Sequence, residues 1–419
     1  MKKIFILSLI LLVTIATAAF LVPYTLTNKS TETKPFYVGV AFCGNSTSEA
    51  KLLIDRVKTY TNLFVLQSFN FSRNETATKE ICDYAVAQNL NIIVNFLNSA
   101  SRDSSALAWQ LPLLRNAKQR WGNRFLGVYF DDEPGGIQLD TDWASYFASP
   151  NFTMRSRQPW FRNSSLYKIY QETLKPNVNS STPKNYSEEA KWFTDIINWT
   201  LHPDQWKDQW KAAGITSFTS DWALYWWDYL GGYDVILAQL GWNHTLTQDI
   251  ALVRGAARLQ NKTWGAIITW KYTEAPYLDN GAAIYNQTLM AYEAGAKYVV
   301  IFNYPKIEGN PYGIMTDEHF EALELFWNDV MTEPNLKTIP DFSQAEAALV
   351  LPKNYGWGMR HPDDKIWGFW GPDEKSPQIW ELSRKLLSQY GLSLDIVYDA
   401  PAFPVTGKYP QIYYWNQTS

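Results

Sequence analysis

Three adjacent acidic residues end the apolar segment FLGVYFDDEPGG, residues 125–136. The apolar run predicts a strand buried on both faces, and the Pro-Gly-Gly after the acids predicts where the chain leaves that strand. Side-chain alternation along a strand would place Asp131 and Glu133 on the side of Tyr129, and Asp132 on the opposite side. Two carboxylates on one side repel each other, which raises the pKa of one and makes it a usable general acid. The alternative is that these acids only cap the next helix or bind a cation.

Apolar runs that could form strands alternate with helical stretches between residues 36 and 305. The candidate strands are residues 36–42, 63–69, 91–97, 125–131, 215–221, 234–240, 264–272 and 297–303. Such alternation is typical of parallel β/α units, and eight of them predict an α/β protein with a (β/α)8 TIM barrel. A doubly wound open sheet is the alternative. No glycine-rich phosphate loop follows the first strand, so nucleotide binding has little support.

We expect the barrel to span residues 35–335. The connection after the fourth strand, residues 137–214, is too long for an ordinary crossover and predicts a cleft wall, because such insertions lie over the C-terminal face of a barrel. A change of composition marks a small C-terminal α/β module at residues 340–419. Its pattern resembles in part the flavodoxin-like or amidotransferase-like domain that follows the barrel in some β-galactosidases. We interpret its loop Met359–Asp364 as a solvated turn; the alternative is that this loop reaches the barrel.

The C-terminal ends of the expected strands supply the candidate site, because the active sites of such barrels form there. Asp131 and Glu133 follow the fourth strand and Glu274 follows the seventh, and we interpret all three as candidate catalytic residues. The candidate substrate-binding residues, several of them aromatic, lie at the same ends: Tyr129, Asp221, Gln239, Trp242, Trp270, Tyr272 and Asn303. The alternatives are that the Trp side chains only pack inside the barrel and that Glu274 caps the next helix.

Glu133 and Glu274 together resemble the catalytic pair of retaining glycoside hydrolases built on (β/α)8 barrels. In that clan an acid/base Glu ends strand four and a nucleophile Glu ends strand seven. The acid/base often lies between Asn and Pro, whereas here Asp132-Glu133-Pro134 has Asp in place of Asn. The resemblance implies that Glu133 protonates the leaving oxygen while Glu274 attacks the sugar, since such hydrolysis needs two carboxyl groups facing one bond.

The pair Asp131 and Glu133 also resembles the D-x-E ending of strand four in chitinase-like hydrolases. That resemblance again implies Glu133 as the acid, and it implies that Asp131 orients an N-acetyl group of the substrate, which acts as the internal nucleophile. The longer acidic signature of that family requires a further Asp where this chain has Tyr129.

Charge and missing motifs exclude several other classes. Lys+Arg 37 against Asp+Glu 41 leaves a formal charge of -4, so no overall basic field predicts nucleic-acid binding. The histidines are scattered without zinc-ligand spacing and no G-x-S-x-G motif occurs, so we expect neither a zinc enzyme nor a serine hydrolase, and no cofactor or metal. A metal-dependent hydrolase that uses Asp131, Asp132 and Glu133 as ligands is a third class, weakened because no further ligand clusters with them.

The N-terminus and the sequons predict an exported protein. Residues 1–27 begin Met-Lys-Lys and continue with an apolar run, which predicts a signal peptide or an N-terminal membrane anchor. Sequons of the form N-x-S/T begin at Asn28, Asn45, Asn70, Asn74, Asn151, Asn163, Asn179, Asn185, Asn198, Asn243, Asn261, Asn286 and Asn416. They predict an N-glycosylated protein that is secreted or displayed at the cell surface. Cys43 and Cys82 either form a disulfide there or remain buried thiols.

Two functional hypotheses follow. The first is an exported glycoside hydrolase that acts on a polysaccharide or surface glycan. The second is a non-catalytic glycan-binding or cell-envelope protein on a glycosidase-like barrel. The carboxyl separation would discriminate them, because about 5–5.5 Å suits retention and about 6.5–9.5 Å suits inversion. A Glu274 that points away from Glu133 would favour the binding hypothesis. The sequence leaves the oligomeric state open.

Overall fold

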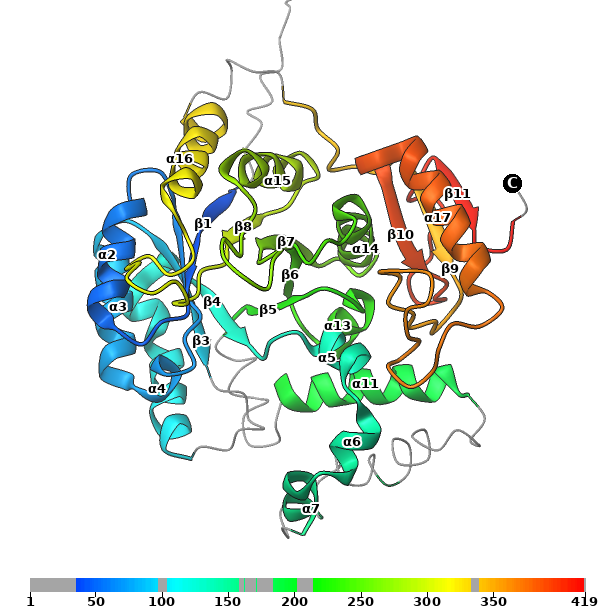
Figure 1. The fold of residues 1–419 in the computed structure, drawn as a ribbon, viewed down its shortest axis with the longest axis horizontal. Coiled ribbons are helices and arrows are strands. Elements are labelled where there is room, and N and C mark those ends of the chain that lie inside the picture. Colours follow the sequence, from blue (N-terminus) through cyan, green and yellow to red (C-terminus); the bar gives the residue numbers. More distant parts are fainter. Residues whose placement is uncertain are drawn as a thin grey trace, which may run out of the picture. The chain divides into compact units, whose positions relative to one another are not determined.

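The computed structural model describes residues 35–96, 104–157, 162, 171, 184–201, 214–332 and 339–417. These residues contain a closed barrel of eight parallel strands and a separate three-stranded sheet (Figure 1). The barrel strands follow one another in sequence order around the circle, and β1 pairs with β8 to close it. The predicted (β/α)8 fold is confirmed.

All eight predicted strands form, at the predicted places. They are β1 Tyr37–Phe42, β2 Leu63–Leu66, β3 Asn91–Phe96, β4 Phe125–Phe130, β5 Ser217–Asp221, β6 Val235–Leu240, β7 Thr263–Ile268 and β8 Tyr298–Ile301. The helices between and after them are α2 Thr47–Val57, α3 Glu75–Ala87, α4 Ser104–Trp121, α13 Tyr225–Gly231, α14 Leu246–Leu259, α15 Gly281–Glu293 and α16 Asp317–Phe326. Side chains of Ser46, Asn74 and Asn280 cap α2, α3 and α15 at their N-termini, which accounts for these starting points.

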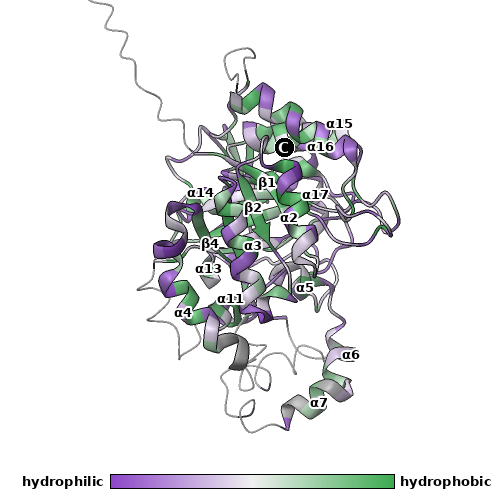
Figure 2. Ribbon diagram, turned by 90° about the vertical axis from the view of Figure 1, so that its left-hand side faces the viewer, coloured by the Kyte–Doolittle hydropathy of each residue, from purple (hydrophilic) through white to green (hydrophobic). Residues whose placement is uncertain are grey.

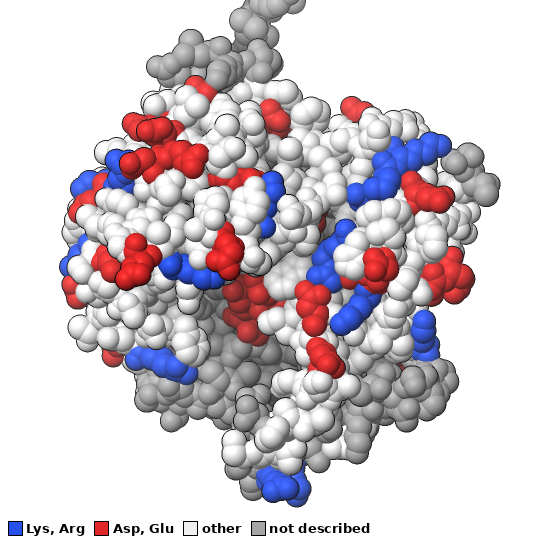
Figure 3. All heavy atoms as spheres, viewed as in Figure 1, with Lys and Arg blue, Asp and Glu red and all other residues white. Residues whose placement is uncertain are grey.

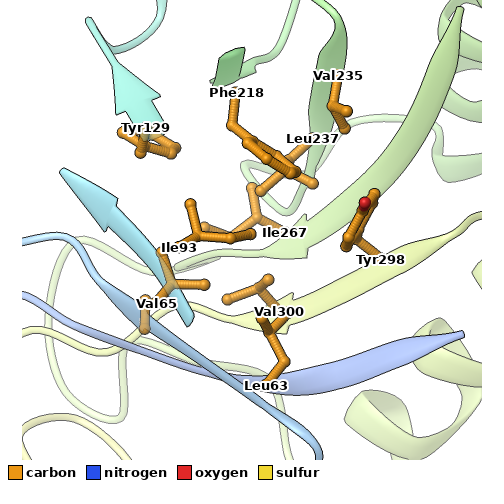
Figure 4. Packing of buried hydrophobic residues seen from close by; sticks show 11 residues of the cluster. Leu63, Val65, Ile93, Tyr129, Phe218, Val235, Leu237, Ile267, Tyr298 and Val300 are labelled. Carbon is orange, nitrogen blue, oxygen red and sulfur yellow. The ribbon is translucent and has the colours of Figure 1, made fainter. Parts of the chain in front are cut away.

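Alternate residues of the strands fill the inside of the barrel. Leu63 and Val65 of β2, Val235 and Leu237 of β6, and Val300 of β8 all belong to one buried cluster (Figure 4). The hydropathy colouring shows the strands as largely hydrophobic and the helices as mixed (Figure 2). The barrel interior is therefore a packed core, and only the strand ends are free to carry chemistry.

The connection between β4 and β5 carries extra helices, as its length predicted. They are α5 Pro134–Asp140, α6 Trp143–Ala148, α7 Pro150–Ser156 and α11 Tyr186–Leu201. The helix α5 begins at Pro134, the residue that follows the acidic triplet, so the insertion begins at the candidate site. Residues 202–213 of this connection fall outside the described residues.

The C-terminal sheet is small and parallel. Its strands β9 Ala347–Leu351, β10 Leu394–Tyr398 and β11 Gln411–Tyr414 lie in the order β10-β9-β11, and α17 Ser376–Tyr390 connects β9 to β10. The Arg254 guanidinium of α14 donates to Asp395 Oδ1 of β10 at 2.7 Å, and both side chains are almost fully buried. This buried, hydrogen-bonded ion pair anchors the sheet on a barrel helix.

Among the described residues, no helix combines the length and apolar character needed to cross a bilayer. The expected signal peptide or anchor, residues 1–27, lies outside the described part of the chain.

Candidate active site

The acidic triplet lies at the C-terminal end of β4, where the backbone turns sharply. Asp131 and Glu133 adopt left-handed conformations with φ of 46° and 57°. This breaks the alternation expected of a strand, so the neighbours Asp132 and Glu133 both line one pocket. The predicted pairing of Asp131 with Glu133 is wrong for this reason. The Asp131 backbone carbonyl instead accepts a bond from the Thr219 hydroxyl at 3.0 Å.

Asp221 at the end of β5 holds the chain just beyond the triplet. Its carboxylate accepts the backbone N–H groups of Gly135 at 2.5 Å and Gly136 at 2.9 Å. A Cβ atom at Gly136 would lie 2.1 Å from the Trp222 ring, so only glycine permits this close approach. Asp221 is fully buried. The structure thus gives this predicted substrate-binding residue a structural contact with the start of α5.

Asp132 is held by two hydroxyl groups. The Tyr129 hydroxyl donates to Asp132 Oδ1, and the Ser220 hydroxyl donates to the same oxygen at 2.9 Å. The Ser220 backbone N–H donates to the Tyr129 hydroxyl at 3.2 Å. Burial and the negative charge of Asp132 raise the pKa of Tyr129, so the phenol keeps its proton and remains a donor. These bonds favour the ionised form of Asp132.

Glu133 is held by Gln239 of β6. The Gln239 amide donates to Glu133 Oε1 at 2.6 Å and to the Ser220 hydroxyl at 3.0 Å. The Trp242 indole donates to Gln239 Oε1 at 2.9 Å, which fixes the amide orientation. The Glu133 backbone N–H also donates to the Ser220 carbonyl at 2.9 Å. The side chain of Glu133 is therefore fixed to β6 and its backbone to β5.

Burial, followed by the negative charge of Asp132, raises the pKa of Glu133 to about 8. The charges of Asp221 and Asp140 act in the same direction, whereas the bond from Gln239 opposes it. Desolvation of its carboxyl group also raises the pKa of Asp132, although the residue as a whole is exposed, and the bonds from Tyr129 and Ser220 oppose that rise. The predicted rise for Glu133 is confirmed in direction, but the charge that assists it is Asp132 rather than Asp131. At neutral pH Glu133 therefore holds a proton.

The pocket around these groups has a volume of about 470 Å³. Its lining comes from six strand ends: Gln67, Asp132, Glu133, Ser220, Gln239, Ile267, Thr269, Trp270, Phe302, Tyr304 and Lys306. The Trp270 ring lies 5.7 Å from the Phe302 ring, 5.9 Å from Tyr304 and 6.1 Å from Trp242, between centroids. One wall of the pocket is therefore aromatic. The other carries polar groups that can exchange protons and hydrogen bonds.

Gln67 brings an unused acceptor to this pocket. Its side chain is 9% exposed, and its Oε1 atom has no hydrogen-bond partner within the described protein. A buried amide oxygen without a partner costs free energy, and a bound hydroxyl group would satisfy it.

Three of the predicted site residues lie elsewhere. Glu274 and Tyr272 are exposed and line a second depression of about 730 Å³ on the loop after β7. Asn303 lines a third cavity of about 200 Å³, where its Oδ1 accepts the Ile314 backbone N–H at 3.0 Å. The structure therefore does not bring Glu274 into the pocket of Glu133.

The pocket also contains residues that were not predicted from the sequence. Ser220 and Gln67 lie at strand ends and line the pocket with Asp132. For Gln67 a signal existed, because a polar residue interrupts the apolar run LFVLQSF at its C-terminal end. For Ser220 none existed, since serine is ordinary in a strand. Asp132 was assigned to the wrong side because the left-handed turn at Asp131 leaves no mark in the sequence.

No group of His, Cys, Asp and Glu side chains within the described ranges is arranged to hold a metal ion. Cys43 and Cys82 are both free thiols, and burial raises the pKa of each. The surface in the view of Figure 3 mixes acidic and basic side chains over the face shown.

No protein-family model and no curated protein matches the chain. Solved structures that are similar to it include a beta-mannanase from the blue mussel Mytilus edulis, with 10% identity, 70% of this chain and 92% of that chain covered, and a TM-score of 0.38. An endo-1,4-beta-mannanase from Eisenia fetida is 14% identical over 69% of this chain and 90% of that chain, with a TM-score of 0.39. A truncated 3-deoxy-D-arabino-heptulosonate 7-phosphate synthase from Thermotoga maritima is 7% identical over 74% of this chain and 90% of that chain, with a TM-score of 0.38. At these values the likeness carries no argument about function, which depends on the site itself.

Proposed function

We propose that the protein is a glycoside hydrolase in which Glu133 is the general acid. The observation that carries this proposal is the pair of carboxyl groups Asp132 and Glu133 in one pocket, where Asp132 accepts bonds from two hydroxyl groups and Glu133 accepts one from an amide. Burial raises the pKa of Glu133 to about 8, which keeps this group protonated at neutral pH. A protonated and an ionised carboxyl group are what hydrolysis of a glycosidic bond requires. The aromatic wall around Trp270 offers faces on which a sugar ring can stack.

In the proposed reaction Glu133 donates its proton to the glycosidic oxygen as the bond from this oxygen to the anomeric carbon breaks. Positive charge then develops at the anomeric carbon and on the ring oxygen, and the ionised Asp132 stabilises it. The Glu133 carboxylate afterwards accepts a proton from the water that completes hydrolysis. This version shares the acid Glu133 with the chitinase-like hypothesis, but Asp132 takes the place of Asp131 and stabilises the positive charge directly instead of orienting an N-acetyl group.

The pocket also suggests how the substrate is bound. The Gln67 Oε1 atom, which lacks a partner within the described protein, is proposed to accept a sugar hydroxyl group. Replacing Gln67 by Leu should therefore raise KM about 5-fold, the equivalent of one lost hydrogen bond, and leave kcat within about twofold. The primary test is a digestion screen of polysaccharides and glycans with reducing-end detection. If the purified wild-type protein releases no sugar from any of them, hydrolysis is rejected.

We further propose export and N-glycosylation. The sequon asparagines whose exposure the structure describes are all exposed: Asn45, Asn70, Asn74, Asn185, Asn198, Asn243, Asn261, Asn286 and Asn416. Exposure at every one of these positions supports attachment of glycans, because an attached glycan is bulky and must project into solvent. Mass spectrometry of glycopeptides from the natural source would test this, and unmodified asparagines would contradict it.

A second candidate is a non-catalytic glycan-binding protein. The observation in its favour is that Glu274, the expected nucleophile, lines a different depression from Glu133. A glycan that binds the wild-type protein tightly but is never cleaved would establish this candidate instead.

A further inference from the structure

The helix α5 starts directly after Glu133, and both of its ends are fixed. At its start, the Asp221 carboxylate accepts the backbone N–H groups of Gly135 and Gly136. At its end, Arg360 donates to both oxygens of Asp140, from Nη1 to Oδ2 at 2.9 Å and from Nη2 to Oδ1 at 2.8 Å. Arg360 belongs to the segment after β9, which the sequence analysis interpreted as a solvated turn. That interpretation is wrong, because Arg360 reaches the barrel insertion.

Arg360 is itself held rigidly. Its Nε donates to Asp364 Oδ2 at 2.8 Å, and its Nη2 donates to Asp364 Oδ1 at 2.7 Å. The Arg360 side chain is 13% exposed and the Asp364 side chain 1%. A two-pronged bond to one buried carboxylate fixes the plane of the guanidinium, which then presents its remaining donors to Asp140.

The same C-terminal segment also contacts the middle of α5. The Gln138 amide donates to the Trp367 carbonyl at 2.8 Å. At Gly368 the C-terminal segment lies so close to α5 that a Cβ atom on this glycine would be 2.0 Å from the Gln138 carbonyl oxygen. The segment is anchored independently, since the buried pair of Arg254 and Asp395 attaches the module to α14.

We infer that the C-terminal module completes the catalytic site, and that Arg360 is a positioning residue which holds Glu133 through Asp140 and α5. This inference rests on the proposed function. Its physical reason is that Glu133 is the N-cap residue of a helix only seven residues long, Pro134–Asp140, so that a displaced helix end displaces the acid. Misplacement of a catalytic group by about 1 Å can cost a factor of about 10² in rate.

The first test is a double-mutant cycle on kcat with Arg360→Met and Asp140→Asn. Each single variant should lower kcat about 10-fold and leave KM within about twofold, because the pocket that binds substrate is unchanged. The double variant should be no slower than the slower single variant, since both changes break one link. Arg360→Lys, which keeps the charge but loses the two-pronged geometry, should recover only part of kcat.

The matched control is Arg120→Met. Arg120 makes an equally two-pronged pair with Asp83, at 2.8 Å and 2.5 Å, but it joins α4 to α3, which supply no described residue of the pocket. This variant should keep the wild-type kcat. If Arg120→Met lowers kcat as much as Arg360→Met, or if the two effects in the cycle simply add, the inference is overturned.

The second test does not depend on activity. The carboxyl carbon of Glu133 is titrated by NMR in ¹³C-glutamate-labelled full-length protein, with Glu133→Gln to assign the signal. The charged groups that act on Glu133 are Asp132, Asp221 and Asp140. Asp140→Asn removes a negative charge about 10 Å from Glu133 and should lower the titration midpoint of Glu133 by about 0.3 pH unit, the effect of one charge at that distance in a high dielectric. Arg360→Met leaves the charge of Asp140 unpaired and should raise the midpoint.

The two tests separate the failures. If the midpoints of the two variants shift in these directions but the wild-type protein cleaves no glycan, the hydrolase proposal is rejected and the link between Arg360 and Glu133 still holds. Midpoints identical in all three proteins, together with an unchanged kcat, would overturn the link. Should Arg360→Met fail to fold, Asp140→Asn still decides, because the Asp140 side chain is 50% exposed and its replacement leaves the buried Arg360–Asp364 pair intact.

Discussion

Two depressions at the barrel rim each contain a glutamate, and the surroundings of the two carboxyl groups differ. Glu133 is partly buried, accepts a bond from Gln239 at 2.6 Å and lies beside Asp132. Glu274 is exposed on a loop that begins after β7 has ended at Ile268. In the sequence each is a glutamate that follows a strand, although for Glu274 the alternative of a helix cap stays open.

The difference shows that position after a strand is not sufficient for a catalytic role. Glu133 lies three residues beyond the end of β4 and is still bound to the sheet, through its backbone bond to the Ser220 carbonyl at 2.9 Å. Glu274 lies six residues beyond the end of β7 and follows its own loop, where its carbonyl accepts the Tyr277 backbone N–H at 3.0 Å. Fixed neighbours and low solvent exposure, rather than residue type, give a carboxyl group an unusual pKa.

The largest expected effect follows from removing the acid. Glu133→Gln should lower kcat/KM by about 10²–10⁴ on substrates with poor leaving groups, because the amide cannot donate a proton to the glycosidic oxygen. The loss should be much smaller on an activated aryl glycoside, whose leaving group needs no protonation. An equal loss on both substrates would contradict the role of Glu133 as acid.

The next effect concerns the second carboxylate of the same pocket. Asp132→Asn should lower kcat by about 10², because the charge that stabilises the transition state is lost. It should also lower the pKa of Glu133, since the nearest negative charge is gone. The wild-type rate should fall as pH rises through about 8, where Glu133 loses its proton, and this basic limb should move to lower pH in the variant. A basic limb that stays in place would exclude Asp132 as the neighbour that matters.

A third effect appears in stability rather than in rate. The pKa of Glu133 is raised to about 8 in the folded protein, above its unfolded value of about 4.3, so ionisation of Glu133 destabilises the fold as pH rises through this window. Glu133→Gln removes this cost. In urea unfolding, the variant should match the wild type near pH 4 and exceed it by at least about 1 kcal/mol at pH 9. A constant difference at all pH values would instead indicate a simple packing effect.

The smallest effect is expected in the other depression. Glu274→Gln should change kcat/KM by less than about twofold, because an exposed side chain outside the pocket can be replaced with little cost. Mass spectrometry with a slow fluorinated glycoside supplies a second measurement, in which no covalent adduct should form on Glu274. An adduct on Glu274, or a loss of kcat/KM as large as that of Glu133→Gln, would restore the retaining hypothesis. Glu274 would then have to lie in the same site as Glu133 in the active enzyme.

The sequence by itself determined the barrel, the place of each strand and the choice of Glu133. These features are local, because a buried strand needs an apolar run and the ends of parallel strands meet at one face. The turn at Asp131 was hidden, since nothing in three successive acids reveals a left-handed φ of 46°. For the same reason Asp131 was preferred to Asp132.

Only the tertiary structure decided which groups surround Glu133. Gln239 lies 106 residues away in sequence, and the pair of Arg360 and Asp140 spans 220 residues. Contacts of this kind depend on how whole elements pack, and no residue spacing encodes them. The location of Glu274 likewise depends on the path of one loop, because the chain no longer follows the geometry of the barrel beyond Ile268.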